Sequence, residues 1–113
     1  MNETALKTTN ELWKHRREGR SAIEEMAIDC ALAATREYEN RKQQLTVAIE
    51  YCQRELDRCL RSLQQDGRTG NSLGVLQSNG VEVDRLCGET ELARRFAEDA
   101  QERLASVLAA NGQ

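Results

Sequence analysis

Largely apolar side chains recur every three or four residues over two long stretches of the chain. In the first stretch they are Leu45, Ile49, Cys52, Leu56, Cys59 and Leu63. In the second stretch they are Val83, Leu86, Thr90, Ala93, Ala97, Ala100, Leu104 and Val107. This spacing places each set on one stripe of an α-helix and is typical of helices that pack in pairs. The pattern therefore predicts an all-α protein.

The glycines indicate where the two helices are separated. Four of the seven Gly lie between Asp66 and Gly80, and Gly permits backbone conformations that end helices. The first stripe also extends backward to Ile23 at helical spacing. We therefore expect one helix at about 21–65, a Gly-rich loop at 66–80 and another helix at about 81–110.

The N-terminal region carries two signals for the start of a helix. Thr8 with Glu11, and Ser21 with Glu24, both have the spacing of a capping box. With Gly19 just before the second box, the pattern predicts a short helix at about 4–18 that ends before the long one begins. The alternative is a single helix from about Thr4 to Gln65 that tolerates Gly19.

Two amphipathic helices joined by a loop favour a long antiparallel hairpin, similar to a coiled coil. If the hairpin is symmetric about Leu73, Leu56 lies opposite Thr90 and Arg41 reaches Leu104. The short N-terminal helix could convert the hairpin into a three-helix bundle. In either case we expect a single helical domain over residues 1–113.

The first part of the long helix has apolar residues that the hairpin does not cover, because the helix at 81–110 is too short to reach them. We expect these residues to form the partner-binding surface, with Trp13 nearby; they are Ile23, Met26, Ala27, Cys30, Ala34 and Tyr38. Either the helix at 4–18 folds back over them, or a second copy or another protein covers them. The second alternative is favoured because Lys14–Arg20 contains no apolar residue to anchor a fold-back.

Composition and charge narrow the choice of partner. Of the 113 residues, 39% are hydrophobic, 4% are aromatic and 31% are charged, and the net charge is -3. Nucleic-acid binding usually requires a basic excess, so we expect no nucleic-acid partner. We also expect no integral membrane segment, because no apolar run approaches the length of a membrane span. The N-terminus lacks the pattern of a signal peptide, so the expected location is cytoplasmic.

Residues that could support catalysis or metal binding are few. The chain has one His and four Cys, and no two Cys have the spacing of a zinc site. No spacing suggests a nucleophile with its base, although such groups need only be close in space. We therefore expect a protein that is not an enzyme, with no catalytic residue, cofactor or metal ion.

These observations predict a helical protein–protein interaction module, such as an adaptor, a chaperone or an assembly scaffold. Its partner would be another protein or a second copy, bound through the 21–38 stripe. In length, hairpin layout and charge, the chain resembles the small cytoplasmic helical proteins of flagellar and type III secretion systems. The resemblance implies an alternative function as a coiled-coil stalk or chaperone component of a bacterial secretion or flagellar-type export apparatus. It implies no site residues.

Overall fold

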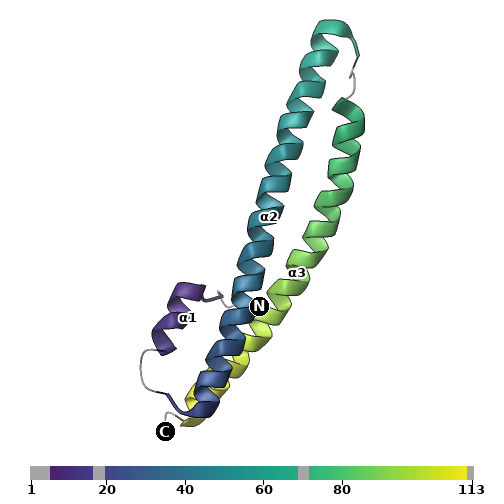
Figure 1. The fold of residues 1–113 in the computed structure, drawn as a ribbon. Coiled ribbons are helices and arrows are strands. Elements are labelled where there is room, and N and C mark those ends of the chain that lie inside the picture. The colour runs from purple at the N-terminus through teal and green to yellow at the C-terminus, as the bar shows by residue number, and fades with distance from the viewer. Residues whose placement is uncertain (1–5, 17–19, 69–71, 112–113) are drawn as a thin grey trace. The chain divides into compact units, whose positions relative to one another are not determined.

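The computed structural model describes residues 6–16, 20–68 and 72–111, and these form three helices (Figure 1). Helix α1 spans Thr9–Arg16, α2 spans Ala22–Asp66 and α3 spans Ser72–Asn111. The described residues contain no β-strand. The predicted class, an all-α helical hairpin, is confirmed.

Both predicted capping boxes are present. The Glu11 backbone N–H donates to Thr8 Oγ1 at 3.2 Å, and the Glu24 N–H donates to Ser21 Oγ at 3.4 Å. In return, the Ser21 N–H donates to Glu24 Oε1 at 3.1 Å. Arg20 and Ser21 are not helical, so the chain breaks between α1 and α2 as predicted. Gly19 lies outside the described residues.

The carboxyl group of Glu24 is electrostatically stabilised at this cap. Hydrogen bonds from the Ser21 backbone N–H and hydroxyl, together with the Arg20 guanidinium, lower the pKa of Glu24 from its ordinary value. A lowered pKa means that the cap stabilises the fold above the pKa of the unfolded chain. This contribution is lost as the pH falls through the lower pKa of the folded state.

The predicted loop at 66–80 is wrong over most of its length, because α3 begins at Ser72. Helix α2 ends as expected: Gly67 has a φ of 69°, and its N–H donates to the Leu63 carbonyl at 3.0 Å. This is the αL motif that commonly stops helices. Helix α3 starts early because Leu76 and Asn79, both half-buried, continue its apolar stripe backward.

The first helix is shorter than predicted. Residues 6–8 are not helical, so α1 begins at Thr9 rather than near residue 4. The difference follows from the capping box, because Thr8 is the residue that caps the helix and cannot lie inside it.

The described chain packs as two compact units. Unit 1 comprises residues 1–40 and 91–113, and unit 2 comprises residues 41–90. Both α2 and α3 therefore contribute to each unit, whereas α1 belongs to unit 1. The predicted single domain over 1–113 stays a prediction.

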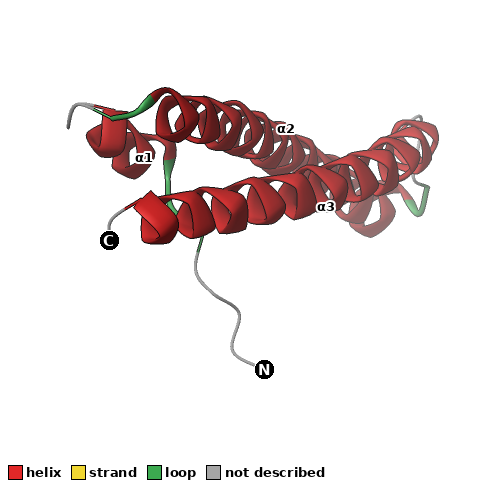
Figure 2. Cartoon of the chain, turned by 90° about the horizontal axis from the view of Figure 1, so that it is seen from below, coloured by secondary structure: helices red, strands yellow, loops and turns green. Residues whose placement is uncertain are grey.

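In unit 1 parts of all three helices pack together (Figure 2), and they share an apolar core. The main apolar cluster comes from all three helices and consists of Leu12, Ile28, Ala31, Leu32 and Leu104. Glu24, Thr35, Ala93 and Ala97 are also buried in this unit. A polar contact joins α2, α3 and the segment before α1, because the Gln101 amide donates to the Lys7 carbonyl at 2.9 Å and to Thr35 Oγ1 at 2.8 Å. The predicted three-helix alternative is thus present in this unit.

Unit 2 consists of two antiparallel helical segments. Its buried side chains are Glu55, Cys59, Leu86 and Thr90. Arg41 and Glu89 form an ion pair across the two segments at 3.2 Å. This unit therefore has a thinner core than unit 1, and part of that core is polar.

The predicted stripe of α3 is confirmed, since every one of its eight positions is buried or half-buried. The predicted stripe of α2 is wrong at every second position. Ile49, Leu56 and Leu63 are exposed. The residue that precedes each of them in the sequence is less exposed and faces α3. These inward residues are Ala48, Glu55 and Ser62.

The predicted register of the hairpin is also wrong. It places Arg41 at Leu104, but Arg41 pairs with Glu89 in the structure. The displacement along α3 is about two heptads. Because a heptad pattern coincides with itself after such a shift, the apolar stripes match in both registers and do not distinguish between them.

We predict that Arg41→Cys with Glu89→Cys cross-links efficiently within one chain, in a background with the native Cys changed to Ala. A short bismaleimide followed by peptide mass spectrometry measures this. Arg41→Cys with Leu104→Cys is the matched control and should cross-link poorly. The reverse preference would contradict the observed register.

Three glycines inside α3 give a second prediction. A Cβ added at Gly74, Gly80 or Gly88 meets nothing within 4 Å, and Ala is a better helix former than Gly by about 1 kcal/mol. Each Gly→Ala substitution should therefore raise the free energy of unfolding by up to this amount, measured by urea denaturation. Gly67→Ala is the control and should lower it, because φ is positive there.

Candidate partner-binding surfaces

The residues predicted to bind a partner do not form one continuous exposed surface. Ile23 and Met26 are 58% and 68% exposed, and Cys30 is also exposed. The other three residues of the predicted stripe are half-buried in unit 1; they are Ala27, Ala34 and Tyr38. Ala27 packs against the apolar core of this unit.

Helix α1 does not bring Trp13 close to this stripe. Helix α1 packs through Leu12 on the face of α2 that carries Ile28 and Leu32. At 100° per residue, Ile23 and Cys30 point well away from that face. Trp13 is half-exposed at 39%, and the Arg16 guanidinium lies 5.7 Å from the centre of its ring.

The expectation that α1 lacks an anchor for folding back is corrected. Leu12 is fully buried against α2 and α3, and polar contacts supply the remaining attachment. Arg16 forms an ion pair with Asp29, and the Thr9 backbone N–H donates to Glu39 Oε2 at 3.3 Å. Charged and polar groups therefore anchor a segment that has few apolar residues.

A second apolar surface, absent from the predicted site, lies on α2 within unit 2. We call it the outer stripe; it consists of Ile49, Leu56, Leu60 and Leu63, which are 39%, 46%, 48% and 45% exposed. Their spacing of seven, four and three residues places them on one side of the helix. Four large aliphatic side chains in a row on one helix are unusual for a surface without a function.

The outer stripe is more apolar than the stripe that α2 turns toward α3. The inward positions include Ala48, Cys52 and Ser62, and also Glu55, which is only 3% exposed. The carboxylate of Glu55 pairs with Arg58 at 2.9 Å, one turn further along the same helix. The sequence signal for this arrangement was present, since α2 contains two overlapping heptad patterns that share Leu45, Cys52 and Cys59.

Acidic residues flank the outer stripe. Glu50 follows Ile49, and Asp57 follows Leu56, one heptad apart on the same side of the helix. Both are exposed, and neither forms an ion pair with any residue that the structure describes. A ligand on this side of α2 would therefore meet apolar side chains with negative charge beside them.

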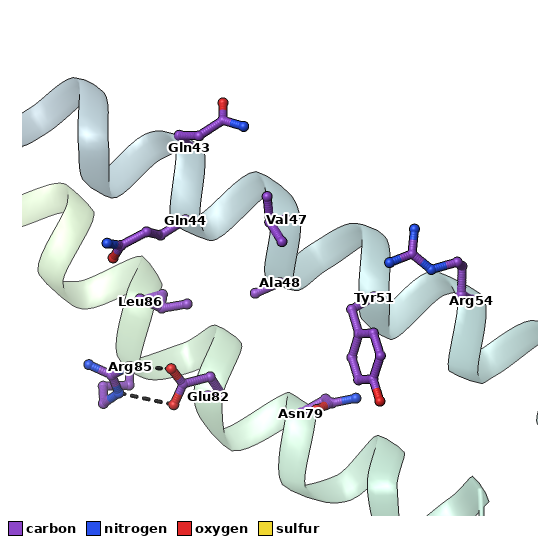
Figure 3. A pocket seen from close by; sticks show the side chains of 10 residues that line it. All are labelled: Gln43, Gln44, Val47, Ala48, Tyr51, Arg54, Asn79, Glu82, Arg85 and Leu86. Atoms are coloured by element: carbon purple, nitrogen blue, oxygen red, sulfur yellow. Dashed lines mark hydrogen bonds and ion pairs between the residues drawn. The ribbon is translucent and has the colours of Figure 1, made fainter.

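An open cleft of about 510 Å³ lies between α2 and α3 in unit 2 (Figure 3). Its α2 wall includes Val47, Tyr51 and Arg54, and its α3 wall includes Glu82 and Arg85. Figure 3 shows Arg85 directed at Glu82 rather than into the cleft. The hydrogen bond from Arg85 lowers the pKa of Glu82. The charged groups on the α3 wall are therefore already paired.

The four cysteines form no disulfide. Cys59 is buried and Cys52 half-buried, whereas Cys30 and Cys87 are exposed. Within the described ranges, no group of His, Cys, Asp and Glu could hold a metal ion. None of the described helices combines the length and apolar character needed to cross a membrane.

Comparison of the chain with protein-family models, with curated proteins and with solved structures gave no match.

The buried carboxylate gives a third prediction. Glu55 occupies an interface position with a single ion-pair partner that is itself largely exposed, and replacing such a buried charge with an apolar side chain often stabilises a protein. Glu55→Leu should therefore raise the free energy of unfolding by about 1 kcal/mol or more, measured by urea denaturation. Glu55→Gln is the isosteric control. A large loss of stability in Glu55→Leu would show that the carboxylate is required for packing.

Proposed function

We propose that this chain is a non-enzymatic helical protein–protein interaction module, acting as an adaptor, a chaperone or an assembly scaffold. The observation that carries the proposal is the outer stripe of α2. Burying a Leu or Ile side chain is worth about 1.5–3 kcal/mol, so a partner that covered Ile49, Leu56, Leu60 and Leu63 would gain substantially from the contact.

The packing of unit 2 supports this reading. On α2, small and polar groups such as Ala48 and Glu55 face α3, while the larger Leu56 and Leu60 face outward. In a chain that worked alone, we would expect the larger side chains to be inside. The arrangement instead favours a surface that is completed by another molecule.

The 21–38 stripe remains a second proposed contact surface. Exposed Ile23, Met26 and Cys30 form its accessible part, with Trp13 on a different side of unit 1. The complete proposed set includes the half-buried residues Ala27, Ala34 and Tyr38. Either another protein or a second copy of the chain could bind there.

The outer stripe can be tested by paired substitutions. Leu56→Asp with Leu60→Asp should abolish the association of the chain with its partner and leave helicity and stability nearly unchanged, because both side chains are already about half-exposed. In vivo cross-linking in the native host with mass spectrometry measures association. Circular dichroism and urea denaturation measure the fold.

Two matched variants provide controls. Val47→Asp changes an exposed apolar residue on another side of α2 and should preserve association. Ile23→Asp with Met26→Asp tests the 21–38 stripe in the same assay. The proposal fails if no cross-linked species of the native chain exists, or if all these variants form it equally.

The alternative is a coiled-coil stalk or a chaperone component of an export apparatus. A stalk would remain monomeric in solution, whereas a chaperone would form a dimer or a complex with its client. Light scattering on the purified chain and on the cross-linked species separates the two by mass.

A further inference from the structure

The way in which α1 binds to unit 1 defines a small docking site on α2. Leu12 inserts among Ile28, Ala31 and Leu32 of α2 and Leu104 of α3. One turn further along α1, Arg16 forms an ion pair with Asp29. The site therefore consists of a cluster of apolar side chains with a carboxylate beside it, and α1 contacts it through a Leu and an Arg spaced four residues apart.

The residues of this docking site occur again four heptads later in α2. Ile28, Asp29, Ala31 and Leu32 correspond to Leu56, Asp57, Cys59 and Leu60. Because a heptad shift preserves the position of a residue relative to the contact stripe of a packed helix, the second set stands beside the α3-facing stripe in unit 2 as the first set does in unit 1. Helix α3 runs in the opposite direction, and a step of four heptads back from Leu104 leads to Leu76.

The two sets differ in whether they are covered. In unit 1, α1 lies on the first set, and Ile28 and Leu32 are 0% and 4% exposed. In unit 2, Leu56 and Leu60 are about half-exposed, and Asp57 pairs with no described residue. Cys59 is buried, as is its counterpart Ala31. The second set therefore has the composition of the α1 docking site without its helix.

We propose that this second set, which we call the repeat site, binds an amphipathic helix of another protein that carries a Leu and an Arg at the spacing of Leu12 and Arg16. The proposal rests on the interaction function inferred above and specifies its ligand. The apolar side of the bound helix would cover Leu56 and Leu60. Its Arg would pair with Asp57, as Arg16 pairs with Asp29.

The carboxylates beside the repeat site could pair with a basic side chain of the bound helix. Glu50 stands one heptad before Asp57 and adds a second carboxylate to the same row. Among the nearby basic side chains, Arg58 pairs with Glu55, Arg54 lines the cleft beside Tyr51, and Arg61 is exposed one turn after Asp57. A bound helix with an Arg on one flank would meet Asp57, which pairs with no described residue.

The number of sites favours a different protein over a second copy. Each chain has two sets of docking residues on α2 but one α1, and that helix already occupies the first set. A second copy that gave its α1 to the repeat site would uncover its own first set. A helix from another protein fills the repeat site without this loss.

The test uses the full chain, labelled with 15N, and a synthetic peptide of residues 6–20 as the probe. Adding the peptide should shift the backbone amide signals of residues 49–63. A peptide with Arg16→Glu should bind at least about tenfold more weakly, because it places like charges together. Leu60→Asp in the chain should remove the shifts at 49–63.

Val47→Asp in the chain is the matched control and should leave peptide binding unchanged. The peptide can also compete with α1 for the first set, so only signals from 49–63 report on the repeat site. No shifts at 49–63 under saturating peptide, or equal binding of the Arg16→Glu peptide, would overturn the proposal. It would also be overturned if the free chain were a dimer that Leu60→Asp converts to monomer, because a second copy would then occupy the site.

This experiment can fail separately from the proposed function. If Leu56→Asp with Leu60→Asp abolishes association in the host but the peptide does not bind, the interaction module stands and the ligand chemistry is wrong. If neither the host assay nor the peptide shows dependence on these residues, both proposals fail.

Discussion

A contact between two helices covers one stripe of each, and this limit determines the rest of the structure. Helix α2 has apolar residues on more than one stripe, so packing against α3 leaves part of its apolar surface open. In unit 1, α1 covers that surface through Leu12. In unit 2 the corresponding side chains, among them Leu56 and Leu60, remain exposed. The proposed function follows from this difference between the two units.

The contact between α2 and α3 in unit 2 is weak because of the residues that form it. Ala48 and Ser62 bury little apolar area, and Glu55 requires Arg58 to balance its charge. The facing segment of α3 contains three glycines at positions where a Cβ would meet no other atom. Each of them weakens the helix by about 1 kcal/mol relative to Ala. We therefore expect unit 2 to open more readily than unit 1, and a helix bound at the repeat site would stabilise it.

Local signals predicted the helices well. The capping box at Ser21 identified the start of α2, and the stripe of α3 identified its buried face. The capping box at Thr8 is also present, but the predicted helix began near residue 4, ahead of it. These features depend on residues within one or two turns, where spacing determines geometry. The early start of α3 was missed because its glycines indicate a loop, whereas packing of Leu76 and Asn79 keeps the segment helical.

Features that depend on contacts between residues far apart in the sequence could not be predicted from spacing. Leu45, Cys52 and Cys59 belong to two overlapping heptad patterns in α2, and size alone favoured the set with Ile49, Leu56 and Leu63. The register failed for a related reason, since heptads match after any whole shift. Arg41 and Glu89 distinguish the registers, but only the structure shows their contact. The predicted partner surface at Ile23–Tyr38 depends on the same register, in which α3 ends before it reaches Ile23. In the structure α3 does reach the start of α2, where the Asn111 amide donates to Ser21 Oγ at 3.3 Å.

The same periodicity that makes the register ambiguous also explains how a second docking site can exist. A sequence that repeats its residue types every seven positions presents equivalent surfaces at intervals along the helix. Helix α1 has only eight residues, and a helix that short is unstable in water by itself. Helix α1 is held in place by the burial of Leu12 and by the ion pair between Arg16 and Asp29. Docking and helix formation are therefore coupled. A partner segment bound at Leu56, Asp57 and Leu60 would be subject to the same constraint and would fold as it binds.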